Sequence, residues 1–217
     1  MSDLIIAIDG PAGAGKSTVA KRLAKELGLA FLDTGAMYRA IALKAHRNGL
    51  GPDDGEQAGL LAAASTIRFE AGEPQKVFLD DEDITSLIRT PEIGELASAL
   101  SAHTPVRRVL AERQKEAVRQ GGYTLEGRDT TTVIAPQARV RVFLTASLEE
   151  RTKRRFQELE DKGTFVDRNA LMQQIADRDH RDSNREDSPL LLVDGVTEIV
   201  TDKMSIEEVI EAIRQLL

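Results

Sequence analysis

The amino-acid sequence predicts an α/β fold, in which a mostly parallel sheet is covered by helices and carries a small antiparallel insert. Three observations lead to this prediction. Strand and helix patterns alternate along most of the chain, which is typical of parallel sheets. A glycine-rich loop joins the first strand to the first helix. One segment, 64–90, breaks the alternation with period-two patterning. The 217 residues are enough for one such domain without disulfide support.

The first strand and the first helix have the clearest signals. Leu4–Ile8 is an uninterrupted apolar run, as expected of a buried strand. Helix 16–27 places its apolar residues on one face and stops at Gly28. The further strands expected from the sequence are Ala30–Leu32, Tyr123–Glu126, Val140–Leu144 and Glu198–Thr201. The further helices are 36–47, 92–101, 105–120, 147–161, 169–184 and 206–216, the last opening on a capping box of Ser205 and Glu208.

The insert lies between about 64 and 90. Thr66–Glu70 and Lys76–Asp80 alternate apolar and polar residues around a turn at Ala71–Pro74, and a short third strand includes Asp83 and Ile84. Gly49–Gly59 reads as a polar connection. We therefore expect a small antiparallel sheet inserted into the parallel fold.

The loop between the first strand and the first helix has the form G-x-x-x-x-G-K-S. Its glycines allow backbone N–H groups to converge on phosphates, and the helix N-terminus adds partial positive charge. Lys16 would reach the terminal phosphates and the Ser17 hydroxyl would ligate Mg²⁺. The residues expected to bind ATP are Gly10, Pro11, Ala12, Gly13, Ala14, Gly15, Lys16, Ser17 and Thr18.

Three other stretches carry candidate chemistry. Asp33–Arg39 follows the second strand, and Thr34 can cap the next helix; this stretch is either a second anion site or a capped helix with a solvated arginine. In Glu126–Asp129 an arginine and a carboxylate stand side by side after a strand. They are either part of an active site at the sheet edge or a simple surface ion pair.

The third stretch, the segment 151–185, is rich in arginine. Arg151, Arg154 and Arg155 share one helix face, Arg178, Arg181 and Arg185 share another, and acidic residues such as Asp179 alternate with them. Such faces suit phosphoryl transfer but are also typical of a solvated helix with internal ion pairs.

Composition excludes several function classes. The net charge of −7 argues against nucleic acid as a general partner. The absence of cysteine excludes disulfides and thiolate metal sites, and is consistent with a reducing compartment. We expect neither a signal peptide nor a membrane span, since the apolar runs are short.

Five stretches together resemble the bacterial cytidylate kinases, within the nucleoside monophosphate kinase group of P-loop kinases. They occur in family order and cover nearly the full length. The phosphate loop is shared by many families, whereas the Asp33–Arg39 and Arg178–Arg185 stretches are far more specific. The stretches are Ile8–Thr18, Leu32–Arg39, Glu126–Asp129, Val142–Ser147 and Arg178–Arg185.

The resemblance implies a five-stranded parallel sheet, a nucleotide-binding insert and an arginine-bearing lid. On this basis the chain is a single P-loop kinase domain. Its core comprises 1–35, 91–153 and 169–217, the region that binds the monophosphate, with its β insert, spans 36–90, and the lid spans 154–168. The implied reaction is reversible Mg²⁺-dependent transfer of the γ-phosphoryl group of ATP to CMP or dCMP.

The resemblance also assigns site residues by motif position. Those implied to bind CMP are Thr34, Arg39, Ser98, Arg107, Arg128, Asp129, Asp182 and Arg185. Those implied to act on the transferring phosphoryl group are Lys16, Arg128, Arg155, Arg178 and Arg181. The implied partners are ATP and CMP or dCMP, with no nucleic acid and no membrane, and the protein is expected to be a cytoplasmic monomer.

The chain departs from the family pattern at two places. Ser17 stands where many relatives have glycine, which should only help Mg²⁺ binding. Thr130-Thr131-Thr132 stands where an apolar residue followed by Gly-Thr is common. Thr131 therefore adds a Cβ beside Asp129, which affects the expected fit around that residue.

Two other functions share the phosphate loop. A GTPase switch would need an Asn-Lys-x-Asp sequence to read guanine, and the chain has none. A kinase for another small acceptor, such as shikimate, shares the loop and the lid but neither of the two specific stretches nor the insert. The identity of the phosphorylated acceptor separates these alternatives.

Overall fold

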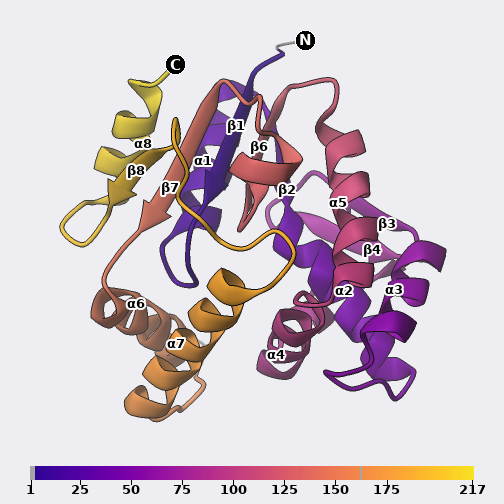
Figure 1. Ribbon diagram of the computed structural model, residues 1–217. Helices are drawn as coiled ribbons and strands as arrows, with labels where there is room; N and C mark the ends of the chain where they lie inside the picture. Colours follow the sequence, from indigo (N-terminus) through magenta and orange to yellow (C-terminus); the bar gives the residue numbers. More distant parts are fainter. Residues whose placement is uncertain (1–2, 162) are drawn as a thin grey trace. The chain divides into compact units, whose positions relative to one another are not determined.

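The computed structural model describes residues 3–161 and 163–217 (Figure 1). The chain packs into two compact units, each formed around its own sheet. Unit 1 contains Met1–Leu32 and Gln120–Leu217, and unit 2 contains Asp33–Arg119. Among the described residues, no helix has the length and apolar character needed to cross a membrane.

Unit 1 is built on a five-stranded parallel sheet with strand order β2-β6-β1-β7-β8. β1 lies at the centre and pairs in parallel with β6 and β7, while β7 pairs in parallel with β8. The predicted parallel sheet is therefore confirmed. The strands are β1 (Ile5–Asp9), β2 (Ala30–Asp33), β6 (Tyr123–Gly127), β7 (Val140–Thr145) and β8 (Thr197–Val200).

The helices of unit 1 follow its strands. α1 begins directly after the phosphate loop, and α6 follows the carboxyl end of β7 (Figure 1). A π-helical turn, Thr130–Ile134, follows β6 and was not anticipated from the sequence. The helices are α1 (Lys16–Leu27), α6 (Leu148–Asp161), α7 (Arg168–Asn184) and α8 (Ile206–Arg214).

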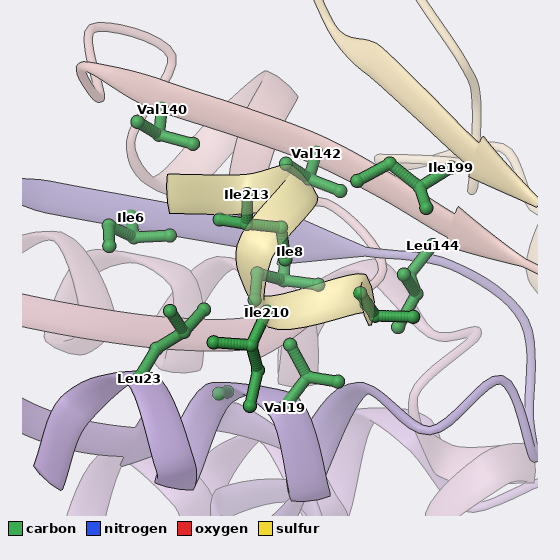
Figure 2. Close-up of a cluster of buried hydrophobic side chains, with 12 residues drawn as sticks. Ile6, Ile8, Val19, Leu23, Val140, Val142, Leu144, Ile199, Ile210 and Ile213 are labelled. Carbon is green, nitrogen blue, oxygen red and sulfur yellow. The ribbon is translucent and has the colours of Figure 1, made fainter. Parts of the chain in front are cut away.

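The main core of unit 1 lies between the sheet and two helices. Figure 2 shows Val19 and Leu23 of α1 and Ile210 and Ile213 of α8 beside the side chains of β1, β7 and β8. Ile213 is completely buried. This packing fixes the carboxyl end of β1, from which the phosphate loop departs.

Unit 2 contains the predicted antiparallel insert. β3 pairs with β4, and β4 pairs with β5, both antiparallel, so the small insert is confirmed. The elements of unit 2 are α2 (Thr34–Arg47), α3 (Gly55–Ala64), β3 (Ile67–Glu70), β4 (Lys76–Leu79), β5 (Glu82–Asp83), a 3₁₀ turn (Leu87–Arg89), α4 (Pro91–Leu100) and α5 (Thr104–Val118).

One prediction was wrong: Gly55–Ala64 is a helix, where the sequence had suggested that Gly49–Gly59 was a polar connection. Ala58 and Ala62 are fully buried, and α3 packs closely on α5. A Cβ at Gly59 would lie 2.7 Å from the Cβ of Pro105, so only glycine permits this approach. Small residues gave α3 a weak periodic signal.

Helices α4 and α5, grouped with the core on the basis of resemblance, pack in unit 2 with α2 and α3. The functional division into core, monophosphate-binding region and lid stays a prediction. The lid prediction, 154–168, covers the end of α6 and the start of α7, and Lys162 within it lies outside the described residues.

Candidate active site

The phosphate loop leaves β1 through a backbone conformation that requires glycine. Gly10 has φ +147°, and a Cβ there would lie 1.9 Å from the carbonyl oxygen of Leu144. Gly15 precedes α1 in the left-handed conformation, with φ 89°. The loop thus turns sharply and presents the N-terminus of α1 at the carboxyl edge of the sheet, as an anion site requires.

Lys16 is a buried cation at the start of α1. Its side chain Nζ donates a hydrogen bond to the carbonyl oxygen of Pro11 at 2.7 Å. Burial is the largest cause that lowers the pKa of Lys16, and the positive charges of Arg128 and Arg178 act in the same direction. Against the opposing effects of Glu126 and Asp9, the pKa falls from 10.5 to about 7. Ser17 and Thr18 follow on the exposed side of the first helical turn.

Asp182 of α7 forms ion pairs with three arginines. Its Oδ2 accepts a hydrogen bond from Arg128 Nε at 2.8 Å, and Arg185 and Arg178 form ion pairs with it at 3.5 and 3.9 Å. Burial alone would raise the pKa of Asp182, but the three guanidinium groups outweigh it and lower the pKa. Unit 1 therefore gathers Arg128, Arg178, Asp182 and Arg185, all of them predicted site residues.

The other two predicted arginines of unit 1 are Arg155 on α6 and Arg181 on α7. Arg155 forms its ion pair with Glu158 on its own helix at 2.6 Å, and no other ion pair of Arg155 is found within residues 3–161 and 163–217. The structure therefore does not bring Arg155 to the Asp182 cluster. Arg181 lies on α7, one turn beyond Arg178, and is half-buried.

Asp129 is buried at the start of the π-helical turn, where its carbonyl oxygen accepts hydrogen bonds from Val133 and Ile134. The next two residues bind Asp9. The N–H and hydroxyl groups of Thr130 donate to one Asp9 oxygen at 2.8 and 2.7 Å, and those of Thr131 donate to the other at 2.7 and 2.6 Å. The threonine hydroxyls thus have a structural role that the sequence did not reveal.

Asp9 itself was missed, although it directly precedes the first glycine of the loop. Its carboxylate is completely buried. Burial raises the pKa of Asp9, and the donors on Thr131 and Thr130 oppose that rise. The signal available in the sequence was a charged residue at the end of an otherwise apolar strand.

Unit 2 carries the other predicted CMP-binding residues. Arg107 of α5 is buried, donates from Nη1 to the carbonyl oxygen of Ser101 at 3.0 Å, and places its guanidinium 5.4 Å from the ring centre of Tyr38. Ser101 in turn donates to the carbonyl oxygen of Ser98 at 2.8 Å. Ser98 and Arg107 therefore belong to one polar cluster on α4 and α5.

Thr34 and Arg39 lie on α2. The helix cap is Asp33, whose carboxylate accepts from the N–H of Ala36 at 2.9 Å, so the expectation that Thr34 caps the helix was wrong. Thr34 is the first helical residue and is buried. Arg39 donates to the carbonyl oxygen of Ile88 at 3.2 Å.

Two further residues contact the phosphate loop and were not predicted. Arg151 of α6 donates to the carbonyl oxygen of Ala12, and Asp179 of α7 accepts from the N–H of the same residue. The sequence had placed Arg151 on a charged helix face and Asp179 among the acidic residues that alternate with the arginines. Their sequence separation from the loop conceals the contact.

Comparison with known proteins gives a family for the chain. The family model described as cytidylate kinase matches residues 6–217. A cytidylate kinase of Listeria welshimeri is 46% identical over 213 residues, covering 98% of this chain and 95% of the relative. A cytidylate kinase of Geobacter sulfurreducens is 46% identical over 215 residues, covering 99% and 92%.

Solved structures show the same fold at much lower identity. The shikimate kinase of Bacteroides thetaiotaomicron matches with a TM-score of 0.50 and 14% identity, covering 98% of this chain and 97% of that chain. At this identity the likeness supports the P-loop kinase fold alone. The full-length family match carries the functional information.

Proposed function

The chain belongs to the cytidylate kinase family, and on that premise we propose that it reversibly transfers the γ-phosphoryl group of ATP to CMP or dCMP. The observation that carries the proposal is the gathering of Lys16, Arg128 and Arg178 in unit 1. The charges of both arginines lower the pKa of Lys16, and both guanidinium groups form ion pairs with Asp182. Concentrated, oriented cations are what transfer between two phosphates needs.

On the donor side, the loop N–H groups and Lys16 would bind the phosphates of ATP. Two negative phosphates beside Lys16 would reverse the effect of burial and keep the ammonium protonated. Lys16 would then leave the Pro11 carbonyl and follow the terminal phosphates. The helix N-terminus of α1 supports the same anion.

The residues present fit Mg²⁺ bound mainly through the nucleotide. Ser17 lies exposed at the start of α1 and can offer its hydroxyl. No cluster of three His, Cys, Asp or Glu side chains suited to a metal is found in residues 3–161 and 163–217. Mg²⁺ commonly keeps water and phosphate ligands and takes few from the protein. When bound, the ion would neutralise charge between the β- and γ-phosphates.

On the acceptor side, we assign Arg39, Arg107 and Arg128 to the phosphate of CMP. Ser98, Arg107 and Asp129 are assigned to the cytosine, Asp182 and Arg185 to the sugar, and Thr34 to the bound monophosphate. The phosphate oxygen of CMP attacks the γ-phosphorus in line, the P–O bond to ADP breaks, and no protein nucleophile is needed. The chain's own residues position the reactants and supply positive charge.

The arginines of α6 and α7 complete the proposal. Arg178 and Arg181, with Arg155, are assigned to the migrating phosphoryl group, and closure of the segment 154–168 would exclude water that otherwise hydrolyses ATP. We further propose that the protein acts as a monomer in the cytoplasm, where ATP and CMP are supplied.

The test is ADP release from ATP and Mg²⁺ with CMP, dCMP, UMP, AMP or shikimate offered separately. We expect strong release with CMP and dCMP and little ATP hydrolysis without an acceptor. Release with shikimate or AMP in place of CMP would refute the proposed acceptor, and rapid hydrolysis without any acceptor would refute water exclusion. Light scattering at the assay concentration tests the monomer.

A further inference from the structure

We propose that Asp179 and Arg151 are positioning residues, which hold the helix that carries Arg178 on the phosphate loop. The inference rests on the proposed function, since it concerns the placement of Arg178 for phosphoryl transfer. It assigns a role to two charged side chains outside the predicted ATP and CMP sets. It is carried by a closed ring of contacts within unit 1.

The ring is centred on the peptide groups of Ala12. The N–H of Ala12 donates to Asp179 Oδ1 at 3.2 Å, and the carbonyl oxygen of Ala12 accepts from Arg151 Nη1 at 3.0 Å. Arg151 Nη1 also donates to Asp179 Oδ2, which closes the ring. Three segments far apart in sequence are thereby joined: the phosphate loop, α6 and α7.

Burial makes this ring specific. The side chain of Arg151 is 9% exposed and that of Asp179 is 20% exposed. Arg151 is anchored a second time, since its Nε donates to the carbonyl oxygen of Ala146 at 2.9 Å. A charged pair so far removed from water is costly to break from one side, because the remaining charge stays buried. The contacts therefore fix α7 more firmly than a surface ion pair would.

The consequence for Arg178 follows from its place on α7. Arg178 directly precedes Asp179, and its charge acts on Lys16. Asp182, one turn further, holds Arg128. The helix is thus tied to the phosphate loop by Asp179 and to Arg128, the residue after β6, by Asp182. Leu171 and Ile175 keep α7 packed on α6, but removing the first tie would loosen α7 at the phosphate loop and displace Arg178 from Lys16.

The experiment compares Asp179→Ala, Asp179→Asn and Arg151→Gln with the unaltered protein in the CMP assay. Displacement of a catalytic group by about 1 Å can cost about 100-fold in rate, so we expect Asp179→Ala to lower kcat by about 10- to 100-fold. The KM for ATP should change by less than about 3-fold, because Lys16 and the loop glycines remain. Asp179→Asn keeps an acceptor for Ala12 and should lose less kcat than Asp179→Ala.

The matched control is Asp177→Asn on the same helix. Asp177 is exposed and, among the described residues, accepts a hydrogen bond only from Gln173, at 2.8 Å, so removing its charge should leave kcat unchanged. If Asp179→Asn retains the kcat of the Asp177→Asn control, the positioning role is refuted. Because Asp179 and Arg151 act as one unit, the double variant Asp179→Asn, Arg151→Gln should lose no more than the worse single variant. Full additivity would also refute the inference.

A second readout separates this inference from the proposed function. The backbone amide signal of Ala12 in an ¹⁵N–¹H NMR spectrum should move in Asp179→Asn and stay in place in Asp177→Asn. An unmoved Ala12 signal would refute the ring whatever the activity. Absence of CMP-dependent transfer in the unaltered protein, together with a moved Ala12 signal, would refute the proposed function and leave the ring intact.

Discussion

Asp9 shows how a single buried carboxylate can join two segments at the carboxyl edge of a parallel sheet. It ends the central strand, and both of its oxygens are bound by the N–H and hydroxyl groups of Thr130 and Thr131. Those threonines directly follow Arg128 and Asp129. Asp9 thereby fixes the start of the phosphate loop against the segment that presents Arg128. Thr131 has its Cβ in a fully buried position and uses its hydroxyl for this contact.

The hydroxyl of Thr131 can be tested by Thr131→Val, which keeps the shape of the side chain. Loss of one donor to a buried carboxylate should lower the free energy of unfolding by about 1–3 kcal/mol and raise the pKa of Asp9 further. Denaturant unfolding at pH 7 measures the first effect. Thr131→Ser should restore most of the stability. Thr132→Val serves as the control, because within the described residues the Thr132 hydroxyl makes only a 3.5 Å contact with the carbonyl oxygen of Asp129.

Arg178→Ala tests the role proposed for Arg178 at the transferring phosphoryl group. Cationic groups of this kind contribute roughly 10³–10⁵ in rate to related phosphoryl transfers, so most turnover should be lost. ATP affinity should change modestly, because the loop and Lys16 remain. Steady-state kinetics and ATP titration measure the two quantities separately. A turnover close to that of the unaltered protein would remove Arg178 from the mechanism.

Ser98→Ala tests base selection in unit 2. Ser98 is buried in the polar cluster with Ser101 and Arg107. Polar groups matched to cytosine reject uracil because a mismatched edge leaves them unpaired, so the variant should lose part of the preference for CMP over UMP. The measurement is the ratio of kcat/KM for the two acceptors. An unchanged ratio would place base reading at other residues.

At the level of elements, the sequence predicted those with strong periodic or motif signals. All five parallel strands, the antiparallel insert and the helices with long apolar faces were confirmed. Helix α3 was missed because its buried face consists of alanine and glycine, whose burial adds little to an apolar pattern. The π-helical turn was missed because it depends on buried hydrogen bonds to Asp9, which is more than a hundred residues away.

In the candidate site, too, the sequence predicted the residues with a local motif and missed those that depend on distant contacts. The phosphate loop and the Arg178–Arg185 stretch have local spacing that indicates their chemistry, and the structure gathers Arg128, Arg178, Asp182 and Arg185. The ring of Ala12, Arg151 and Asp179 has no local signature. Its three residues are distant in sequence. On a helix where acidic and basic residues alternate, the sequence does not indicate which side chain is buried against another segment.

Helix α8 offers a test of how the sheet is stabilised. Ile213 is fully buried against the strands, whereas Ile206 of the same helix is 42% exposed. Ile213→Ala should lower the free energy of unfolding by about 2–5 kcal/mol, through lost transfer energy and the cavity left behind. Ile206→Ala should cost clearly less. Denaturant unfolding of both variants makes the comparison, and equal losses would contradict the observed packing.

At the scale of the whole molecule, the buried ammonium of Lys16 links stability to pH. Its pKa is about 7 in the folded protein, against 10.5 ordinarily. Between these values the unfolded chain binds more protons than the folded one, so the contribution of Lys16 to stability rises with pH from about 7 to 10.5. Below pH 7 the cost of burying the charge is fully present.

The prediction is a stability difference between the unaltered protein and Lys16→Met that depends on pH. Without nucleotide, Lys16→Met should be stabilised relative to the unaltered protein at pH 6, and the gain should shrink at pH 9. Unfolding in denaturant at the two pH values measures it. A gain that is independent of pH would show that Lys16 does not titrate in this range.

The order of the sheet has a consequence for synthesis of the chain. β1 is made first but lies at the centre, and its partners β6 and β7 emerge only after the whole of unit 2. At about 5–20 residues per second, the roughly 115 residues between β1 and β6 take roughly 6 to 23 s to translate. During this time an apolar strand has both edges unpaired on the ribosome, which exposes the nascent chain to aggregation. Recovery of soluble protein should therefore depend on chaperone supply while the chain is being made.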